Sequence, residues 1–308
     1  MVYGNDGRQV GNDSFVKAAT TTTILDTFLK GKRWNFVIKS EKKMKTIFIT
    51  GASTGLGKAA AKLFAAKGWK VIATMRKPQD EKELNLIDNI SLLPLDVTNL
   101  AQIEASTKEA IASGDIDVVF NNAGYGLMGP LESTSDAQLV RQLDTNILGV
   151  IRVTQAFIPY FRARQAGLFI STTSIGGLIT FPFSSVYHAT KWALEGWSES
   201  MAFELKKIGV GIKTVSPGGI KTDFLSRSAE MSTHPVYEKW LAQLFAGFDE
   251  NHFTSAEQIA EVVYEAATDG KDQLRYVAGE DAKALYAQRL ELGDEAFRKQ
   301  MEQTFLGN

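Results

Sequence analysis

The sequence of 308 residues contains no cysteine and only three histidines, His188, His234 and His252. The missing cysteines exclude disulfides, thiolate nucleophiles and cysteine metal sites, and they suit a reducing, cytoplasmic location. Three scattered histidines do not suggest a histidine metal cluster, so we expect no metal site. No apolar run approaches the ~20 residues of a membrane-spanning helix, and we expect no span.

The charges of the chain nearly cancel, because 34 Lys and Arg residues stand against 35 Asp and Glu residues. Such a balance provides no global field that would attract nucleic acid or an anionic membrane, and we expect neither as a partner. Hydrophobic residues make up 44% and charged residues 22% of the chain, as in ordinary soluble globular proteins.

The first 43 residues differ in composition from the rest. Residues 1–23 are rich in Gly, Asn, Asp and Thr, and a mixed stretch from Ile24 ends in the charged run 39–43. A secretory signal would need a basic start and an apolar segment, and neither is present. We expect residues 1–43 to form a disordered extension, with a functional arm or a helix around 24–29 as alternatives.

From Met44 the sequence alternates between short β-branched runs and segments with apolar residues at helical spacing. The predicted strands are 45–50, 70–74, 90–95, 118–121, 167–172 and 211–215, and the predicted helices are 57–67, 81–86, 100–113, 136–164 and 184–208. This alternation favours a central parallel sheet with helices on both faces. Right-handed crossovers make a single doubly wound, Rossmann-type α/β domain, residues 44–308, the leading topology.

A glycine-rich turn, TGASTGLG, joins the first predicted strand to the first predicted helix. Its glycines permit a sharp turn, close approach of the backbone to a pyrophosphate, and close helix packing. The free N–H groups and partial positive charge of the helix N-terminus favour phosphate. The alternative is a glycine-rich turn that binds no ligand. The predicted dinucleotide contacts are Gly51, Ser53, Thr54, Gly55, Leu56 and Gly57.

The second predicted strand ends in Arg76 and Lys77, with no acidic residue. An NAD site usually places Asp or Glu there to bind the ribose hydroxyls, whereas an arginine can hold a 2′-phosphate. We therefore predict a preference for NADP(H), with NAD(H) as the alternative and Lys58 as a weaker helper. Asp96, after the third strand, is predicted to meet the adenine amino group or to cap the next helix.

Seven features in order resemble the single-domain short-chain dehydrogenase/reductase family. They are TGASTGLG (50–57), Asp96, NNAG (121–124), Asn146, Ser174, YHATK (187–191) and PGGIKT (217–222), and the resemblance extends over residues 45–279. It implies an NADP-dependent alcohol dehydrogenase or carbonyl reductase. The segments NNAGYGLMGPLE and SPGGIKTDF are similar to the hydroxysteroid- and retinol-dehydrogenase-like branch.

The resemblance implies that Asn146, Ser174, Tyr187 and Lys191 are the catalytic residues. Tyr187 and Lys191 share one helix face, and we expect the ammonium to lower the tyrosine pKa from about 10 toward the working range. An ordinary amphipathic helix could also carry such a pair. Ser174, with Ser171 as a rival, would hydrogen-bond the substrate oxygen, and Asn146 would hold a water of the proton relay.

The same resemblance implies further cofactor contacts. The turn after the fourth strand would contact the adenosine half, or it would be purely structural. The segment after the sixth strand would hold the nicotinamide carboxamide, and the lysine would bind the nicotinamide ribose. The residues concerned are Asp96, Val97, Asn122, Ala123, Gly124, Tyr187, Lys191, Pro217, Gly218, Ile220 and Thr222.

The segment 223–255 is rich in large apolar residues and corresponds to the mobile substrate lid of this family. An apolar lid suits a hydrophobic carbonyl or alcohol, such as a steroid-, retinoid- or lipid-like compound. A hydrophobic substrate is also indicated by the apolar residues Met128, Leu178 and 181–183. Helical spacing equally suits an ordinary core for Trp240, Leu241, Leu244, Phe245 and Phe248.

Family members often pair through the helix that carries the tyrosine, so a homodimer or homotetramer is predicted, with Trp192 and Trp197 at the interface or in the core. Two other functions share parts of the pattern. A non-catalytic NADP-binding redox sensor would have a broken set of catalytic residues, yet all four are present. A nucleotide-sugar epimerase or dehydratase usually carries GxxGxxG and a larger C-terminal domain, and the sequence shows neither.

Overall fold

A computed structural model describes residues 28–29, 32–33, 44–221, 229–246 and 253–307 of the chain. The chain divides into two compact units, residues 1–43 and 44–308. In the first unit, Phe28–Leu29 (β1) pairs with Lys32–Arg33 (β2) as an antiparallel ladder. Residues 28–29 are thus a strand, which contradicts the alternative of a helix reaching residue 29. The disorder expected for the rest of this segment lies outside the described residues.

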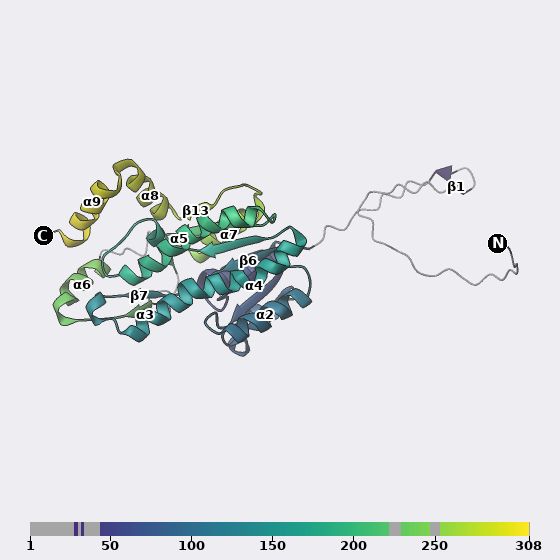
Figure 1. Cartoon of the computed structure of the whole chain (residues 1–308), viewed down its shortest axis with the longest axis horizontal. Helices are drawn as coiled ribbons and strands as arrows, with labels where there is room; N and C mark the ends of the chain where they lie inside the picture. Colours follow the sequence, from purple (N-terminus) through teal and green to yellow (C-terminus); the bar gives the residue numbers. More distant parts are fainter. Residues whose placement is uncertain (1–27, 30–31, 34–43, 222–228, 247–252, 308) are drawn as a thin grey trace, which may run out of the picture. The chain divides into compact units, whose positions relative to one another are not determined.

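A parallel sheet of seven strands forms the centre of the second unit, in the order β13-β9-β8-β6-β3-β4-β5. Its strands β6 and β13 are labelled in Figure 1. This confirms the predicted α/β, doubly wound fold class. The seventh strand, β13, was not predicted from the sequence. The strands are Thr46–Ile49 (β3), Lys70–Met75 (β4), Ile90–Pro94 (β5), Val118–Asn121 (β6), Leu168–Thr172 (β8), Gly211–Pro217 (β9) and Arg275–Ala278 (β13).

Helices cover both faces of this sheet because successive strand residues point to opposite sides. Ile47 and Ile49 of β3 pack with Gly55–Ala66 (α1) and Ala256–Thr268 (α7). Phe48, between them, packs on the other face with the second group of helices. That group consists of Leu100–Ala112 (α2), Gly149–Arg164 (α4) and Ser185–Lys206 (α5).

The region predicted as one helix from 136 to 164 is divided by a π-helical turn. Asp136–Leu143 (α3) is followed by the π turn Asp144–Leu148 and then by α4. π turns of this kind occur frequently at functional sites, and this one carries Asn146. The predicted helix at 81–86 is instead a pair of short 3-10 turns, Pro78–Asp80 and Leu84–Leu86.

Smaller elements surround the carboxyl ends of the strands. Gly126–Met128 (β7) pairs in parallel with Ala229–Met231 (β11), and Ile220–Lys221 (β10) pairs with Thr254–Ser255 (β12). Further 3-10 turns are Leu131–Ser133, Ile175–Gly177 and Pro235–Tyr237, and the remaining helices are Glu238–Ala246 (α6), Glu280–Leu292 (α8) and Asp294–Leu306 (α9). No helix in the described part of the chain is long and apolar enough to cross a membrane.

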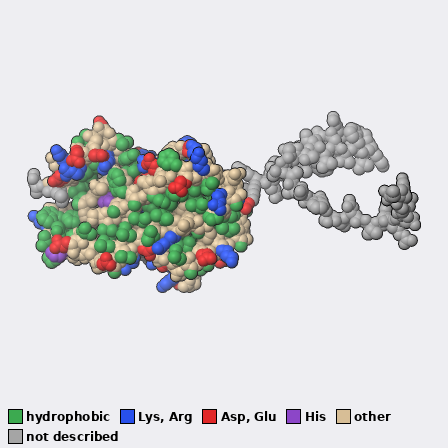
Figure 2. All heavy atoms as spheres, in the orientation of Figure 1, with side chains coloured by type: hydrophobic (Ala, Val, Ile, Leu, Met, Phe, Trp, Pro, Cys, Tyr) green, Lys and Arg blue, Asp and Glu red, His purple; other side chains and the backbone are tan. Residues whose placement is uncertain are grey.

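Two tryptophans of α5 have different surroundings. Trp197 packs against the core cluster shared with α2 and α4, which agrees with the core alternative. Trp192 is exposed, and the Arg289 guanidinium lies 5.2 Å from the centre of its ring. Figure 2 shows hydrophobic side chains among charged ones across the face that α4 and α5 form.

Candidate active site

A cavity of about 1320 Å³ lies at the carboxyl ends of the parallel strands. Ligands of open α/β sheets bind at this edge, and the cavity exceeds the ~300–1,000 Å³ typical of a small-molecule site. It therefore offers room for a dinucleotide together with a second molecule. Residues within two positions of the ends of six strands line it: Gly51 after β3, Arg76 after β4, Leu95 after β5, Asn122 after β6, Thr173 after β8 and Gly218 after β9.

The glycine-rich turn needs its glycines for backbone conformation and for space. Gly51 and Gly55 have φ values of 67° and 52°, in the left-handed region that favours glycine. A Cβ on Gly57 would lie 2.3 Å from the Gly51 carbonyl oxygen and 2.5 Å from Asn122 Nδ2. Gly57 does not line the cavity but permits the close packing of α1, as predicted. Ser53, Thr54 and Leu56 line the cavity beside the turn.

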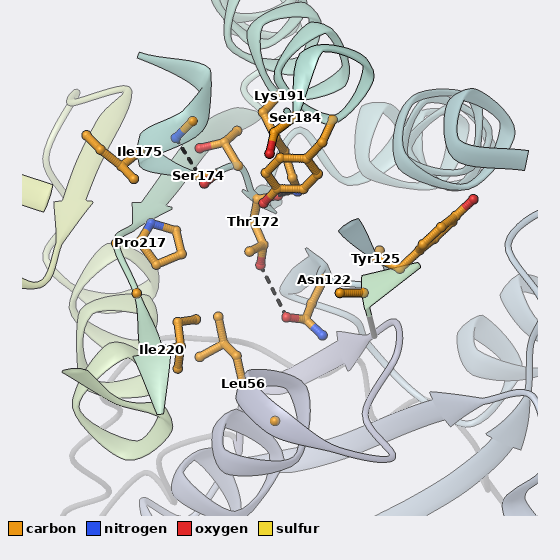
Figure 3. Close-up of a pocket in the computed structure, with 18 of the residues that line it drawn as sticks. Leu56, Asn122, Tyr125, Thr172, Ser174, Ile175, Ser184, Lys191, Pro217 and Ile220 are labelled. Atoms are coloured by element: carbon orange, nitrogen blue, oxygen red, sulfur yellow. Dashed lines mark hydrogen bonds between the residues drawn. The ribbon is translucent and has the colours of Figure 1, made fainter. Parts of the chain in front are cut away.

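The NNAG segment is clamped onto the glycine-rich turn. Thr50 Oγ1 accepts hydrogen bonds from the backbone N–H groups of Asn122 and Ala123, at 2.9 and 3.0 Å. The Asn122 amide donates to the Thr50 and Gly51 carbonyls, both at 3.1 Å, and accepts from Thr172 Oγ1 at 3.3 Å (Figure 3). The NNAG segment therefore has the structural role that was predicted as the alternative to adenosine contact. Asn122, Ala123 and Gly124 also line the cavity.

Arg76 and Lys58 differ in whether their charge is already paired. Arg76 is exposed, lines the cavity, and has no hydrogen bond or ion pair with any described residue. Lys58 lies 3.1 Å from a Glu81 carboxylate oxygen and 2.7 Å from one of Glu83. Hydrogen bonds from Lys58 and Lys62 lower the pKa of Glu83 to about 2. Arg76 is thus without a partner among the described residues, whereas the Lys58 charge is paired; the predicted phosphate roles of both residues stay predictions.

Asp96 lies in the cavity wall and closes a tight turn. Its Oδ1 accepts from the backbone N–H and from Oγ1 of Thr98, at 3.0 and 2.7 Å. The N-cap of α2 is Asn99, whose side chain accepts from the Gln102 N–H at 3.1 Å. The alternative that Asp96 caps this helix is therefore wrong. Val97 is buried and lines the cavity beside it.

Tyr187, Lys191 and Ser174 meet in the cavity wall, as Figure 3 shows for the two labelled residues, Ser174 and Lys191. Lys191 Nζ lies 5.7 Å from the centre of the Tyr187 ring and donates to the Thr172 carbonyl at 2.9 Å. Ser174 Oγ accepts from the Gly176 N–H at 3.0 Å, which leaves its own proton free to be donated. Ser171, the rival serine, is fully buried within β8 and does not line the cavity.

The pKa of Tyr187 is raised, contrary to the lowering expected from Lys191. Burial raises it, and a side-chain hydrogen bond with Ser174 lowers it by less. The loss of phenolate solvation on burial therefore outweighs the hydrogen bond with Ser174. Burial also lowers the pKa of Lys191 to about 8, against the attraction of Glu195. At neutral pH the site thus holds a protonated phenol beside an ammonium group.

Asn146 is buried in the π turn and does not line the cavity, although Thr145 does. Its Oδ1 accepts from the Tyr125 N–H at 3.1 Å, and its Nδ2 donates to the Tyr125 carbonyl at 2.9 Å and to Thr190 Oγ1 at 3.3 Å. Thr190 Oγ1 in turn donates to the Tyr187 carbonyl at 2.7 Å. Asn146 therefore ties the strand β7 region to the helix turn that carries Tyr187, and its water-holding role stays a prediction.

Two titratable residues near the site, His188 and Glu195, were assigned no role from the sequence. His188 Nδ1 lies 2.7 Å from the Gly176 carbonyl, and its Nε2 accepts from the Phe181 N–H at 2.9 Å. Its ring thereby fixes the loop after Ser174. Glu195 is buried and accepts from Ser216 Oγ at 2.9 Å and from Arg275 Nε at 2.9 Å. The spacing of four residues from Lys191 to Glu195 is the signal that could have found it.

The apolar wall of the cavity comes from segments far apart in the sequence. Leu241 and Leu244 of α6 are buried and also line the cavity, so they fit both the substrate-lid and the core interpretation of this segment. Trp240 is 42% exposed. The Phe245 side chain and Phe248 lie outside the described residues. Met128, Phe181 and Phe183 line the cavity, and Leu178 is in a neighbouring core cluster. Lining residues from α8 and α9 were not predicted: Leu285, Gln288, Gln300, Met301, Thr304 and Phe305.

The segment after β9 completes the site. Pro217 and Ile220 face the same hollow as Ser174 (Figure 3), and Gly218 lines it as well. Thr222, predicted to act with them, lies outside the described residues. Within the described ranges, no group of three or more His, Asp or Glu side chains is placed to hold a metal ion.

This combination of a doubly wound sheet, a glycine-rich turn and a Tyr–Lys–Ser group defines a dinucleotide-dependent oxidoreductase site. The model of the short chain dehydrogenase family matches residues 45–233, and the chain belongs to this family. An uncharacterized oxidoreductase of Schizosaccharomyces pombe is 37% identical over 74% of this chain and 99% of its own length. A 3-ketodihydrosphingosine reductase of Bacteroides thetaiotaomicron is 36% identical over 58% of this chain and 65% of its own.

Solved structures agree with this assignment. A short-chain dehydrogenase from Streptomyces avermitilis is 29% identical, with a TM-score of 0.75 over 86% of this chain and 96% of that chain. An alcohol dehydrogenase from Thermococcus sibiricus, complexed with 5-hydroxy-NADP, is 26% identical, with a TM-score of 0.65 over 77% and 97% of the two chains. The chain is thus an oxidoreductase of the short-chain dehydrogenase family. These similarities do not single out the hydroxysteroid and retinol branch.

Proposed function

We propose that the chain is an NADP(H)-dependent alcohol dehydrogenase or carbonyl reductase for an apolar substrate. The observation that carries this proposal is the convergence of Tyr187, Ser174 and Lys191 on a cavity that also reaches the glycine-rich turn. Residues 44–308 would form the catalytic domain, with a lid within 223–255. The hydroxysteroid- and retinol-dehydrogenase-like sequence segments and the name of the Bacteroides relative support a lipid-like substrate.

The residues of the cavity suit a dinucleotide with a 2′-phosphate. The turn at Gly51 and Gly55, with the N-terminus of α1 behind it, would hold the pyrophosphate. Arg76 would bind the 2′-phosphate, because its guanidinium is unpaired among the described residues. The end of β4 also carries no Asp or Glu, whose carboxylate would repel that phosphate. Lys191 would bind the nicotinamide ribose. The nicotinamide supplies or accepts the hydride.

Proton transfer would be the task of Tyr187. In reduction, its phenol donates a proton to the carbonyl oxygen, and in oxidation the phenolate takes the proton back. The raised pKa of Tyr187 suits the donor role at neutral pH. Ser174 Oγ donates a hydrogen bond to the same oxygen and stabilises the negative charge that develops there. The ammonium of Lys191, near the ring, stabilises the phenolate that remains.

The apolar wall supports the substrate class. Leu241, Leu244, Phe181 and Phe183 place hydrocarbon surface around the cavity, so binding would be strongest for a carbonyl compound with little polar surface. A screen of NADPH oxidation across aldehydes, ketones, steroids and quinones would identify active compounds.

The mechanism is tested by Tyr187→Phe, which removes one oxygen and keeps the ring. General acid–base catalysis contributes about 10²–10⁴-fold, so turnover of an active compound should fall by that range. NADPH binding, followed by the change in its fluorescence, should survive because the phenol oxygen is not needed to hold the dinucleotide. Turnover comparable to that of the unaltered enzyme would refute the assigned proton transfer.

A further inference from the structure

Asp281, in the first turn of α8, reaches back to the loop that follows β9. Its Oδ2 accepts a hydrogen bond from the Gly219 N–H at 2.8 Å, and it lines the cavity. The neighbouring Gly218 N–H donates to the Ala278 carbonyl at 3.0 Å. The end of β13 and the start of α8 therefore hold this loop in place. Asp281 lies beyond the residues that the family model matches.

Two glycines make room for the Asp281 carboxylate. A Cβ on Gly218 would lie 2.1 Å from Oδ2 and 2.4 Å from Oδ1. A Cβ on Gly279 would lie 2.5 Å from Oδ1, and Gly279 also has a φ of 99°. The carboxylate thus lies directly against the backbone of the loop, at a distance that any side chain at residue 218 would prevent.

The second carboxylate oxygen is an acceptor without a donor. Asp281 Oδ1 is buried and has no hydrogen-bond partner, and no other carboxylate oxygen in the described part of the chain shares that state. Leaving such a group unsatisfied is costly, and hydrogen bonds to charged groups are among the stronger ones. An N–H or O–H group of a bound molecule would remove this cost.

We infer that Asp281 Oδ1 accepts a hydrogen bond from the amino group of the nicotinamide carboxamide. This rests on the proposed function and on the prediction, implied by the family resemblance, that the segment after β9 holds the nicotinamide carboxamide. Phosphates and a substrate carbonyl are acceptors and would be repelled by the carboxylate, whereas the carboxamide nitrogen is a pure donor. Asp281 would thus bind the reactive end of the cofactor, whereas Arg76 would bind the far end.

The variant Asp281→Asn distinguishes the roles of the two carboxylate oxygens. The amide oxygen can still accept from the Gly219 N–H, but an NH₂ donor replaces the oxygen that would face the carboxamide. Glu280→Gln is the matched control, because it removes the same charge from the same helix turn on an exposed side chain. Thermal unfolding of both variants reports whether the fold is retained.

The readout is binding affinity, measured by calorimetry for NADP⁺ and for 2′,5′-ADP, which lacks the nicotinamide. Asp281→Asn should weaken NADP⁺ about 10- to 100-fold and leave 2′,5′-ADP unchanged, and Glu280→Gln should change neither. Equal weakening of both ligands, or unchanged NADP⁺ binding, would overturn the inference. If the unaltered protein binds neither ligand, the proposed NADP function itself fails.

The first comparison of a second measurement uses the unaltered protein alone, so it does not depend on whether a variant folds. The 3-acetylpyridine analogue of NADP⁺ carries a methyl group where the carboxamide has its amino group, so it offers no donor to Oδ1. The unaltered protein should bind this analogue about tenfold or more weakly than NADP⁺, and Asp281→Asn should lose that discrimination. Equal affinity of the unaltered protein for the two compounds would contradict the assigned hydrogen bond.

Discussion

Replacing Lys191 with methionine should stabilise the cofactor-free protein at neutral pH while it removes activity. Burial lowers the pKa of Lys191 from 10.5 to about 8, so the folded protein bears a desolvated ammonium below pH 8. One pKa unit corresponds to about 1.4 kcal/mol, and the free energy of unfolding is therefore lowered by about 3 kcal/mol at pH 7. Methionine keeps the aliphatic volume and removes the charge.

The sign of the pH dependence follows from the direction of this shift. Between pH 8 and 10.5 the unfolded chain keeps the proton on Lys191 and the folded chain releases it, so stability rises with pH across that window. Below pH 8 both states are protonated and the full cost is present. The stability advantage of Lys191→Met should therefore shrink by about 2 to 3 kcal/mol between pH 7 and pH 10.

Urea unfolding of the two proteins at both pH values measures this change, because distant titrating groups cancel in the difference. Lys206→Met, at the exposed end of the same helix, is the control. A hydrogen bond from Lys206 to Asp272 raises the pKa of Lys206, so its contribution to stability is lost rather than gained as pH rises. A difference between Lys191→Met and the unaltered protein that is constant with pH would refute the reasoning.

Two further predictions concern the cofactor and the first unit of the chain. Arg76→Asp should lower kcat/KM for NADPH at least tenfold more than for NADH, because a carboxylate there repels a 2′-phosphate and can accept from ribose hydroxyls; an unchanged ratio would contradict the phosphate role. Removal of residues 1–43 should leave the melting temperature and turnover of the remaining chain unchanged, since the sheet and cavity belong to 44–308. Loss of folded enzyme would show that this segment supports the catalytic domain.

Six of the seven sheet strands were predictable because buried parallel strands are short, continuous runs of β-branched and aromatic residues. β13 was missed because its sequence, RYVA, is short and follows a polar stretch. The π turn in the region 136–164 was missed because apolar spacing continues through it. Such a turn changes hydrogen bonding over a few residues and leaves little trace in the hydrophobic pattern.

The cofactor side of the site was predicted more completely than the substrate side. Every described residue assigned to the cofactor, apart from Gly57, lines the cavity. Apart from Tyr187 and Lys191, which lie on α5, these residues lie in short motifs just after strands, so their order along the chain fixes their place at the sheet edge. Met301 and Phe305 reach the same cavity from α9, and no local pattern connects them with Phe181. Likewise, the burial that raises the pKa of Tyr187 depends on its neighbours in space.

The contribution of α8 and α9 to the cavity affects the order in which the enzyme is completed during synthesis. A nascent chain extended to residue 233 already contains Tyr187, Lys191 and the glycine-rich turn. It lacks β13, Asp281 and the part of the cavity wall that includes Phe305. The ribosome therefore releases Tyr187 and Lys191 before the residues of α8 and α9 that enclose the cavity. Until α9 packs against the rest of the domain, this part of the cavity wall is missing and the cavity is more accessible to water.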